Sequence, residues 1–301
     1  MKDYRRFFAI AIILALVVFI GCLIVIPEFP TFSNIDFSKE VTGALTEGGT
    51  EENASSLEAG SKGDYNTLRS WGLVRGSSPG LLPRPNPGAA EMLAQYYGIY
   101  LGNTEEKIIY LTFDEGYENG YTSKILDVLF ENKVNAIFFI TGPYLEKEEA
   151  LIQRMIDEGH AVGNHSINHK SLPMITDEEI DREITGLDRR FFERFGKNMV
   201  FLRPPKGEYS ERSLKITSDL GYTNVFWSFA YDDWATNNQR GWEFAYDKVI
   251  RNLHNGAIIL LHAVSSDNAE ALDAIISEAR NQGYEFGNVF DLQKIGQGGK
   301  P

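Results

Sequence analysis

Cysteine and positive charge are both scarce in this chain. Its 301 residues include one cysteine, Cys22, which excludes an intrachain disulfide, so cysteine usage says nothing about the compartment. Lys and Arg number 29 against 42 Asp and Glu, for a formal net charge of -13. Because nucleic-acid phosphates need a basic face, this balance argues against a nucleic-acid partner. The 43% of hydrophobic residues is enough for a sizeable core.

One long apolar run is present, at the N-terminus. Three basic residues within the first six precede twenty uncharged, mostly apolar residues, 7–26. As a helix this run would span about 30 Å, the thickness of a bilayer core, and the positive-inside rule places the rest of the chain outside the cytoplasm. We expect 1–30 to be an uncleaved single-pass membrane anchor. A cleaved secretory signal, or a lipoprotein signal ending at Cys22, is an alternative, and cleavage would give a secreted protein.

The composition changes twice after this run. Residues 31–64 are poor in large apolar residues and rich in Gly, Ser, Thr and Glu, which predicts a flexible linker. Residues 65–106 contain a turn-rich stretch and one short helical pattern, and we expect them to wrap irregularly over the main domain. That domain is expected at 107–296.

Strand and helix patterns alternate throughout this main domain. Such alternation implies an α/β fold with a parallel sheet, open or closed into a barrel. We expect strands at 108–113, 134–141, 161–164, 200–203, 225–228, 257–262 and from 284 onward, and helices at 122–132, 151–159, 176–195, 210–220, 242–254 and 268–281.

Two histidines, His165 and His169, stand four residues apart, and the carboxylates Asp114 and Glu115 directly follow an apolar strand pattern. Two histidines and one carboxylate with an open position can hold a divalent metal that activates water. The second carboxylate is then free to act as a base. An HxxxH pair alone is a weak signal, and its weight comes from the residues around it.

Other polar residues also follow expected strand ends, where active sites of parallel α/β folds lie. Arg203 could orient a carboxylate through a bidentate contact. Asp233 could support a histidine, with Trp234 as an apolar wall, and an apolar strand brings His262 to the same edge. The alternatives are a rigid loop with a surface arginine, a helix-starting turn with a packing Trp, and a structural histidine.

Together these segments resemble the polysaccharide deacetylases (carbohydrate esterase family 4, the NodB homology domain) over about residues 105 to 295. The five family motifs stand in order as TFDEG, HSINH, RPPKG, DDW and LLH. The resemblance implies a distorted (β/α) barrel. The segments around the first, fourth and fifth motifs are most similar to a spore-former subgroup. Its members deacetylate N-acetylmuramic acid in peptidoglycan, on the route to the muramic δ-lactam of spore cortex.

The resemblance also implies roles in catalysis. Asp114 would be the general base, held in place by Arg203. His262 would be the general acid, hydrogen-bonded to Asp233. His165 would be one of the ligands of a divalent metal, with zinc as the first choice and cobalt or manganese as alternatives.

Further roles follow from the same resemblance. His169 would be the second histidine ligand. Trp234 and Leu260 would wall the pocket for the acetyl methyl group, and the backbone near Tyr209 would help to polarise the oxyanion. Most of the family has Asp at the position of Glu115 as the third ligand, and the spore-former subgroup often has Asn. Glu keeps the charge but adds a methylene, so it could reach the metal with a shifted backbone or leave that position to water.

The expected function is therefore metal-dependent de-N-acetylation of N-acetylmuramic acid in peptidoglycan, with release of acetate. A catalytically weak carbohydrate-binding protein on the same scaffold is one alternative. Another is a deacetylase of a different N-acetylated glycan, such as chitin oligomers or N-acetylglucosamine residues. A zincin peptidase is disfavoured, because its HExxH signature is absent: the two histidines enclose Ser166, Ile167 and Asn168.

Overall fold

The computed structural model of the chain describes residues 65–75 and 80–298. The expected membrane anchor at 1–30 and the expected linker at 31–64 lie outside the described residues. Among the helices of the described part, none is both long enough and apolar enough to cross a bilayer.

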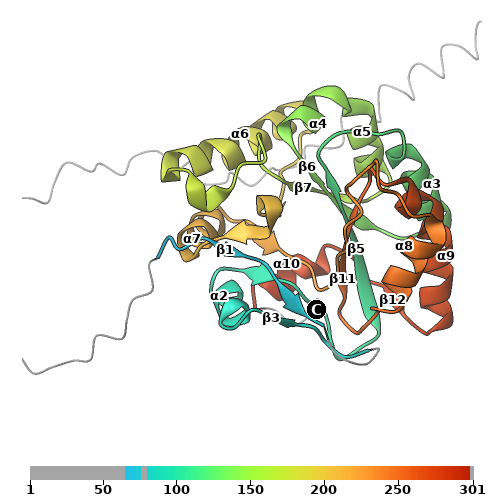
Figure 1. Cartoon of the computed structure of the whole chain (residues 1–301). Helices are drawn as coiled ribbons and strands as arrows, with labels where there is room; N and C mark the ends of the chain where they lie inside the picture. Colours follow the sequence, from blue (N-terminus) through green and yellow to red (C-terminus); the bar gives the residue numbers. More distant parts are fainter. Residues whose placement is uncertain (1–64, 76–79, 299–301) are drawn as a thin grey trace, which may run out of the picture. The chain divides into compact units, whose positions relative to one another are not determined.

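A curled parallel sheet forms the centre of the fold (Figure 1). Its strands follow the order β11-β5-β6-β7-β8-β10-β4, β12 also pairs with β5, and all of these pairs are parallel. An isolated parallel bridge, Phe229 to Ile259, joins the chain after β10 to β11. The sheet is a curled half-barrel, which confirms the expected α/β fold with a parallel sheet. The strands are β4 (Gly98–Ile99), β5 (Ile108–Glu115), β6 (Ala136–Ile140), β7 (Ala161–Asn164), β8 (Phe201–Leu202), β10 (Thr223–Val225), β11 (Ile258–His262) and β12 (Glu285–Phe286).

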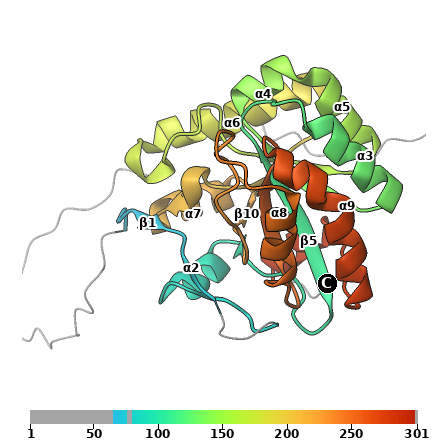
Figure 2. The ribbon, with the colours of Figure 1, turned by 45° about the vertical axis from the view of Figure 1, so that its right-hand side comes forward.

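Most of the helices lie on the outer side of the strands (Figures 1 and 2), whereas α10 packs against the core inside the curl. The longest, α6, begins after the capping box that the sequence predicts, with Thr176 and Glu179 bonding reciprocally, and ends at Gly196, whose φ is 65°. The helices are α2 (Ala89–Gln95), α3 (Thr122–Asn132), α4 (Gly142–Lys147), α5 (Glu149–Asp157), α6 (Asp177–Phe195), α7 (Glu211–Asp219), α8 (Trp242–Ile250), α9 (Ser266–Asn281) and α10 (Asp291–Gly296).

Two expected strands differ from the structure. The strand expected at 225–228 overlaps β10 only at Val225. Phe226 N–H still bonds to Ile99 O of β4, but Ser228 N–H bonds to Ile258 O of β11, so the backbone changes partner before 228. The strand expected from 284 onward is only the two residues of β12, followed by α10. Val289 and Leu292 there are buried in the core inside the curl of the sheet, so tertiary packing favours a helical turn over further pairing. Helix α4 was not expected.

Side chains alternate strictly between the two faces of the central strands, as strand geometry requires. On β5, Ile109, Leu111 and Phe113 belong to the large core shared with the helices. Tyr110 instead belongs to a smaller core inside the curl. Residues of one parity thus face the helices and those of the other face the interior. This alternation decides which polar residues can meet at the strand ends.

The segment 65–106 packs against the loop that follows β8. Strand β1 (Arg69–Ser70) pairs antiparallel with β9 (Glu208–Tyr209), and β2 (Leu73–Val74) pairs with β3 (Arg84–Pro85). Trp71 packs against the buried ring of Phe226 and donates its indole N–H to Trp227 O at 2.9 Å. This segment therefore fixes a loop at the rim of the sheet.

Candidate active site

One cavity of about 520 Å³ lies at the carboxyl ends of the strands and gathers most of the residues singled out from the sequence. Register explains why: His262 on β11 stands directly opposite Asp114 on β5, and both side chains have interior parity. The predicted residues that line this cavity are Asp114, His165, His169, Trp234, Leu260 and His262.

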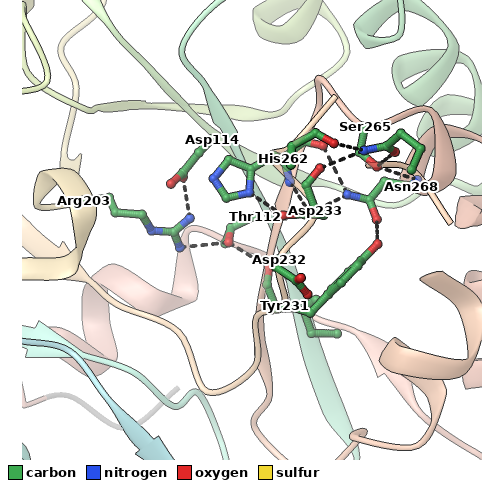
Figure 3. A network of polar contacts seen from close by, with 12 residues as sticks. Thr112, Asp114, Arg203, Tyr231, Asp232, Asp233, His262, Ser265 and Asn268 are labelled. Carbon is green, nitrogen blue, oxygen red and sulfur yellow. Dashed lines mark hydrogen bonds and ion pairs between the residues drawn. The ribbon is translucent and has the colours of Figure 1, made fainter. Parts of the chain in front are cut away.

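Arg203 lies beside Asp114 and holds its carboxylate in place (Figure 3). The guanidinium is fully buried and donates from Nη1 to Asp114 Oδ1 at 2.7 Å, from Nη2 to Thr112 Oγ1 at 2.8 Å and from Nε to Val225 O at 3.0 Å. Burial alone would raise the pKa of Asp114, but the charges of Arg203, His165 and His262 outweigh it and lower the pKa below its ordinary value. Asp114 is therefore ionised at neutral pH, as a general base must be.

The two histidines of the HSINH segment meet at the same cavity. Their ring centroids lie 4.7 Å apart, and the turn between them places His169 at a positive φ of 54°. His165 Nδ1 lies 2.8 Å from Arg203 O, so this nitrogen carries the proton and the lone pair of Nε2 points toward Asp114 Oδ2, 3.5 Å away. Burial lowers the pKa of His165 to about 4, and burial also lowers the pKa of His169. Both rings are therefore neutral at pH 7, the form in which imidazole binds metals.

Glu115 does not join these histidines, in contrast to the expectation from the sequence. It follows Asp114 on β5 and so points to the opposite face, where it is fully buried and accepts from Thr122 Oγ1 at 3.3 Å. Burial first, and then the charge of Glu118, raise the pKa of Glu115 well above its ordinary value. Within residues 65–75 and 80–298, no three His, Cys, Asp or Glu side chains form a ready metal site. The donors that fit a divalent metal are thus the two imidazoles.

His262 is held from the other side by Asp233, and Figure 3 shows its ring between Asp114 and Asp233. His262 Nδ1 lies 2.7 Å from Asp233 Oδ1, while Asp233 Oδ2 accepts from His262 N–H at 2.8 Å and from Asn268 Nδ2 at 2.6 Å. Burial would lower the pKa of His262, but the hydrogen bond and charge of Asp233, together with the charge of Asp114, raise it above the ordinary value. The ring can therefore stay protonated near neutral pH.

Trp234 and Leu260 line the cavity as expected, whereas the side chain of Tyr209 does not. Trp234 is 57% exposed, and its ring lies edge-on to His262 with centroids 5.8 Å apart. Leu260 lies two residues before His262 on β11, on the same face. Tyr209 is fully buried, and its ring packs against Trp71 and Phe226 instead of lining the cavity. The oxyanion role of the backbone near Tyr209 stays a prediction.

Several residues of the site were not singled out from the sequence. Thr112 lies one strand period before Asp114, so strand alternation could have identified it. Asn268 holds Asp233 and accepts from the Tyr231 hydroxyl at 2.5 Å. This contact joins segments far apart in the chain, and no local pattern signals it. Lys206 also lines the cavity.

Comparison with known proteins also finds relatives that are deacetylases. A family model described as Polysaccharide deacetylase matches residues 101–225. The Peptidoglycan-N-acetylmuramic acid deacetylase PdaA of Bacillus subtilis (strain 168) is 50% identical over 202 residues, covering 67% of this chain and 77% of that protein. A Peptidoglycan-N-acetylglucosamine deacetylase of Bacillus cereus is 36% identical over 192 residues, covering 62% of this chain and 88% of that protein.

A solved structure agrees with these matches. The structure of Bacillus subtilis PdaA, described as a family 4 carbohydrate esterase, is similar with a TM-score of 0.73 and 47% sequence identity. The match covers 75% of this chain and 97% of that one. The resemblance seen in the five motifs is thereby confirmed. This chain belongs to the polysaccharide deacetylases, carbohydrate esterase family 4, and is a hydrolase of amide bonds.

Proposed function

We propose that this protein is a metal-dependent peptidoglycan deacetylase that hydrolyses the acetamide of N-acetylmuramic acid residues and releases acetate. The observation that carries the proposal is the facing pair Asp114 and His262, one held ionised by Arg203 and the other held protonated by Asp233. A base and an acid with pKa values pushed apart at one cavity suit amide hydrolysis. The 50% identity to a protein named for action on N-acetylmuramic acid supports the choice of sugar.

Asp114 supplies the basic half of the reaction. Its carboxylate accepts a proton from the water whose oxygen attacks the acetamide carbonyl carbon. Oδ1 is occupied by Arg203, so Oδ2, on the side of His165, is the oxygen available for the proton. The Arg203 contact also fixes the carboxylate in one orientation, because the guanidinium is itself bonded at Thr112 and Val225.

His262 supplies the acidic half. Its Nδ1 is bonded to Asp233, so Nε2 carries the proton that goes to the departing amine nitrogen as the carbon–nitrogen bond breaks. The products are acetate and the free amino sugar. Asp233 is in turn fixed by the backbone of His262 and by Asn268, which keeps the imidazolium oriented.

The two neutral imidazoles suit a divalent metal. We propose that His165 and His169 hold it, with zinc as the first candidate and cobalt or manganese as alternatives. When bound, such an ion polarises the acetamide carbonyl as a Lewis acid. The carbonyl of Arg203 fixes the tautomer of His165, a backbone contact that metal-binding histidines commonly make.

Acetate release from purified glycan strands tests the function. We expect the protein to release acetate from N-acetylmuramic acid residues, with mass spectrometry of the digested strands showing a loss of 42 Da per muramic residue, as general acetyl chemistry requires. Deacetylation of N-acetylglucosamine residues alone would contradict the sugar assignment. Tight glycan binding without acetate release would instead support the weakly catalytic carbohydrate-binding alternative.

The proposed place of action is outside the cytoplasm, with the N-terminal segment as anchor or cleaved signal. The spore-former resemblance supports a role in forming the muramic δ-lactam of cortex. Fractionation of cells with an antibody to the catalytic domain tests the first point. Loss of muramic δ-lactam from the spores of a deletion strain tests the second.

A further inference from the structure

Muramic acid and glucosamine differ at one place on the sugar ring. Muramic acid carries a lactyl ether on the carbon next to the one that bears the acetamide. Where no peptide is attached, that lactyl group ends in a carboxylate. A residue that distinguishes the two sugars must therefore lie in the same cavity as the catalytic pair.

We propose that Lys206 binds the lactyl carboxylate of a muramic residue whose stem peptide has been removed, and so selects this sugar over N-acetylglucosamine. The inference rests on the proposed function. Lys206 lines the cavity together with Asp114 and His262. Among the described residues that line it, Lys206 is the one lysine or arginine.

The ammonium of Lys206 is free to take a ligand. Its side chain is exposed, and across residues 65–75 and 80–298 it has no hydrogen-bond or ion-pair partner. Lys206 lines the cavity beside His169 and His262. Among the described residues, the nearby carboxylate of Glu208 forms no ion pair with Lys206. In a chain of net charge -13, an unpaired cation at this cavity suits an anionic ligand.

The backbone holds Lys206 in a conformation that lysine disfavours. Its φ is 61° and its ψ is 6°, in the left-handed region, and Gly207 follows with a φ of 64°. Neighbouring contacts impose this turn: Gly207 O accepts from Trp71 N–H at 2.8 Å, and Gly207 N–H bonds to Pro204 O at 3.1 Å. A Cβ on Gly207 would meet the Trp227 ring at 2.7 Å, so the loop has no room to relax. Disfavoured backbone that is fixed in this way concentrates at ligand sites.

A matched pair of glycans tests the proposal. Peptide-free glycan strands carry the free lactyl carboxylate, and carbodiimide coupling with methylamine converts it to a neutral methylamide on the same sugar. We expect the wild-type protein to prefer the carboxylate strand by about tenfold in kcat/KM, because a charge-assisted hydrogen bond is lost in the amide. The preference should vanish in Lys206→Met and persist in Lys206→Arg. Equal activity of the wild type on both strands, or a preference that survives in Lys206→Met, would overturn the proposal.

Two further variants separate recognition from folding. Lys206→Gly removes the cation and also relieves the left-handed strain, so it should melt no lower than the wild type and still lose the preference. Lys133 is the matched control, an exposed lysine with a φ of 55° at the end of α3, far from the cavity lining. Lys133→Met should keep the full preference, and its loss there would contradict a specific role for Lys206.

Binding separates this proposal from the proposed function. Calorimetric titration of the two strands into wild type and Lys206→Met reports carboxylate recognition whether or not acetate is released. A carboxylate preference in binding with no acetate release would support the proposed role of Lys206 and contradict the proposed deacetylase function. Acetate release with no carboxylate preference in either measurement would support the deacetylase function and contradict the role of Lys206.

Discussion

The two carboxylates of the TFDEG segment are neighbours in the chain but lie in opposite environments. Asp114 faces the interior of the curled sheet, meets Arg203 and has a lowered pKa. Glu115 faces the helices, meets Thr122 and has a pKa raised well above its ordinary value. Two consecutive residues of one strand are therefore an ionised base and a carboxyl group that favours its neutral form. An acidic pair in a motif does not guarantee two acids at one site.

Of the substitutions that test this comparison, Asp114→Asn should have the largest effect on activity. The change removes the proton acceptor and keeps an oxygen for Arg203 Nη1, so we expect a fall in kcat of roughly 10²- to 10⁴-fold with the fold retained. Acetate release measures kcat, and circular dichroism shows whether the fold is retained. Turnover within a few-fold of the wild type would show that Asp114 is not the base.

His165→Ala extends the comparison to the metal. Loss of one of only two imidazole donors should abolish stoichiometric metal in the dialysed protein, as measured by mass spectrometry of the elements, and activity should fall with it. His160→Gln is the control, since His160 is buried outside the cavity and its Nδ1 accepts from Ala136 N–H at 3.1 Å. Unchanged metal content in His165→Ala would count against the site.

Asp233→Asn should change the pH dependence of turnover. The acid His262 must be protonated, and its raised pKa places the alkaline limb of the kcat profile above the usual range for histidine. Because Asp233 raises that pKa, the variant should lose activity at lower pH than the wild type, with a smaller maximum rate. Asp232→Asn, at an exposed residue that pairs with Arg240 at 2.7 Å, is the control. An alkaline limb that stays in place in Asp233→Asn would refute the assignment.

Glu115→Gln should have the smallest effect. A neutral amide resembles the favoured neutral carboxyl, so activity and metal content should stay within about twofold of the wild type. For a carboxyl group with a raised folded-state pKa, stability is fully present below the unfolded pKa, about 4.3, and declines as the pH rises above it. Glutamine does not ionise, so the variant loses no stability in this way. The melting temperature of the variant minus that of the wild type should therefore increase from pH 4 to pH 8. Loss of bound metal in this variant would restore Glu115 as a ligand.

Much of the fold and most of the site could be predicted because their signals are local. The capping box at Thr176 and the Gly196 stop define α6, and apolar strand patterns place Asp114 and His262 at strand ends. In a parallel sheet those ends share one edge, which explains why separate segments meet at one cavity. Helix α10 was not predicted, because Leu292 packs into the core inside the curled sheet, and a six-residue helix has too few residues to show a helical pattern in the sequence.

The order of residues settled which chemical groups this protein has and, through the alternation of strand and helix patterns, the edge of the sheet where they would gather. Three-dimensional packing settled which of them act together. It gave Asp233 a second support in Asn268 and fixed Lys206 in a left-handed turn at the cavity, where Trp71 N–H bonds to Gly207 O. Both depend on contacts between segments distant in the chain, which a local sequence pattern does not contain.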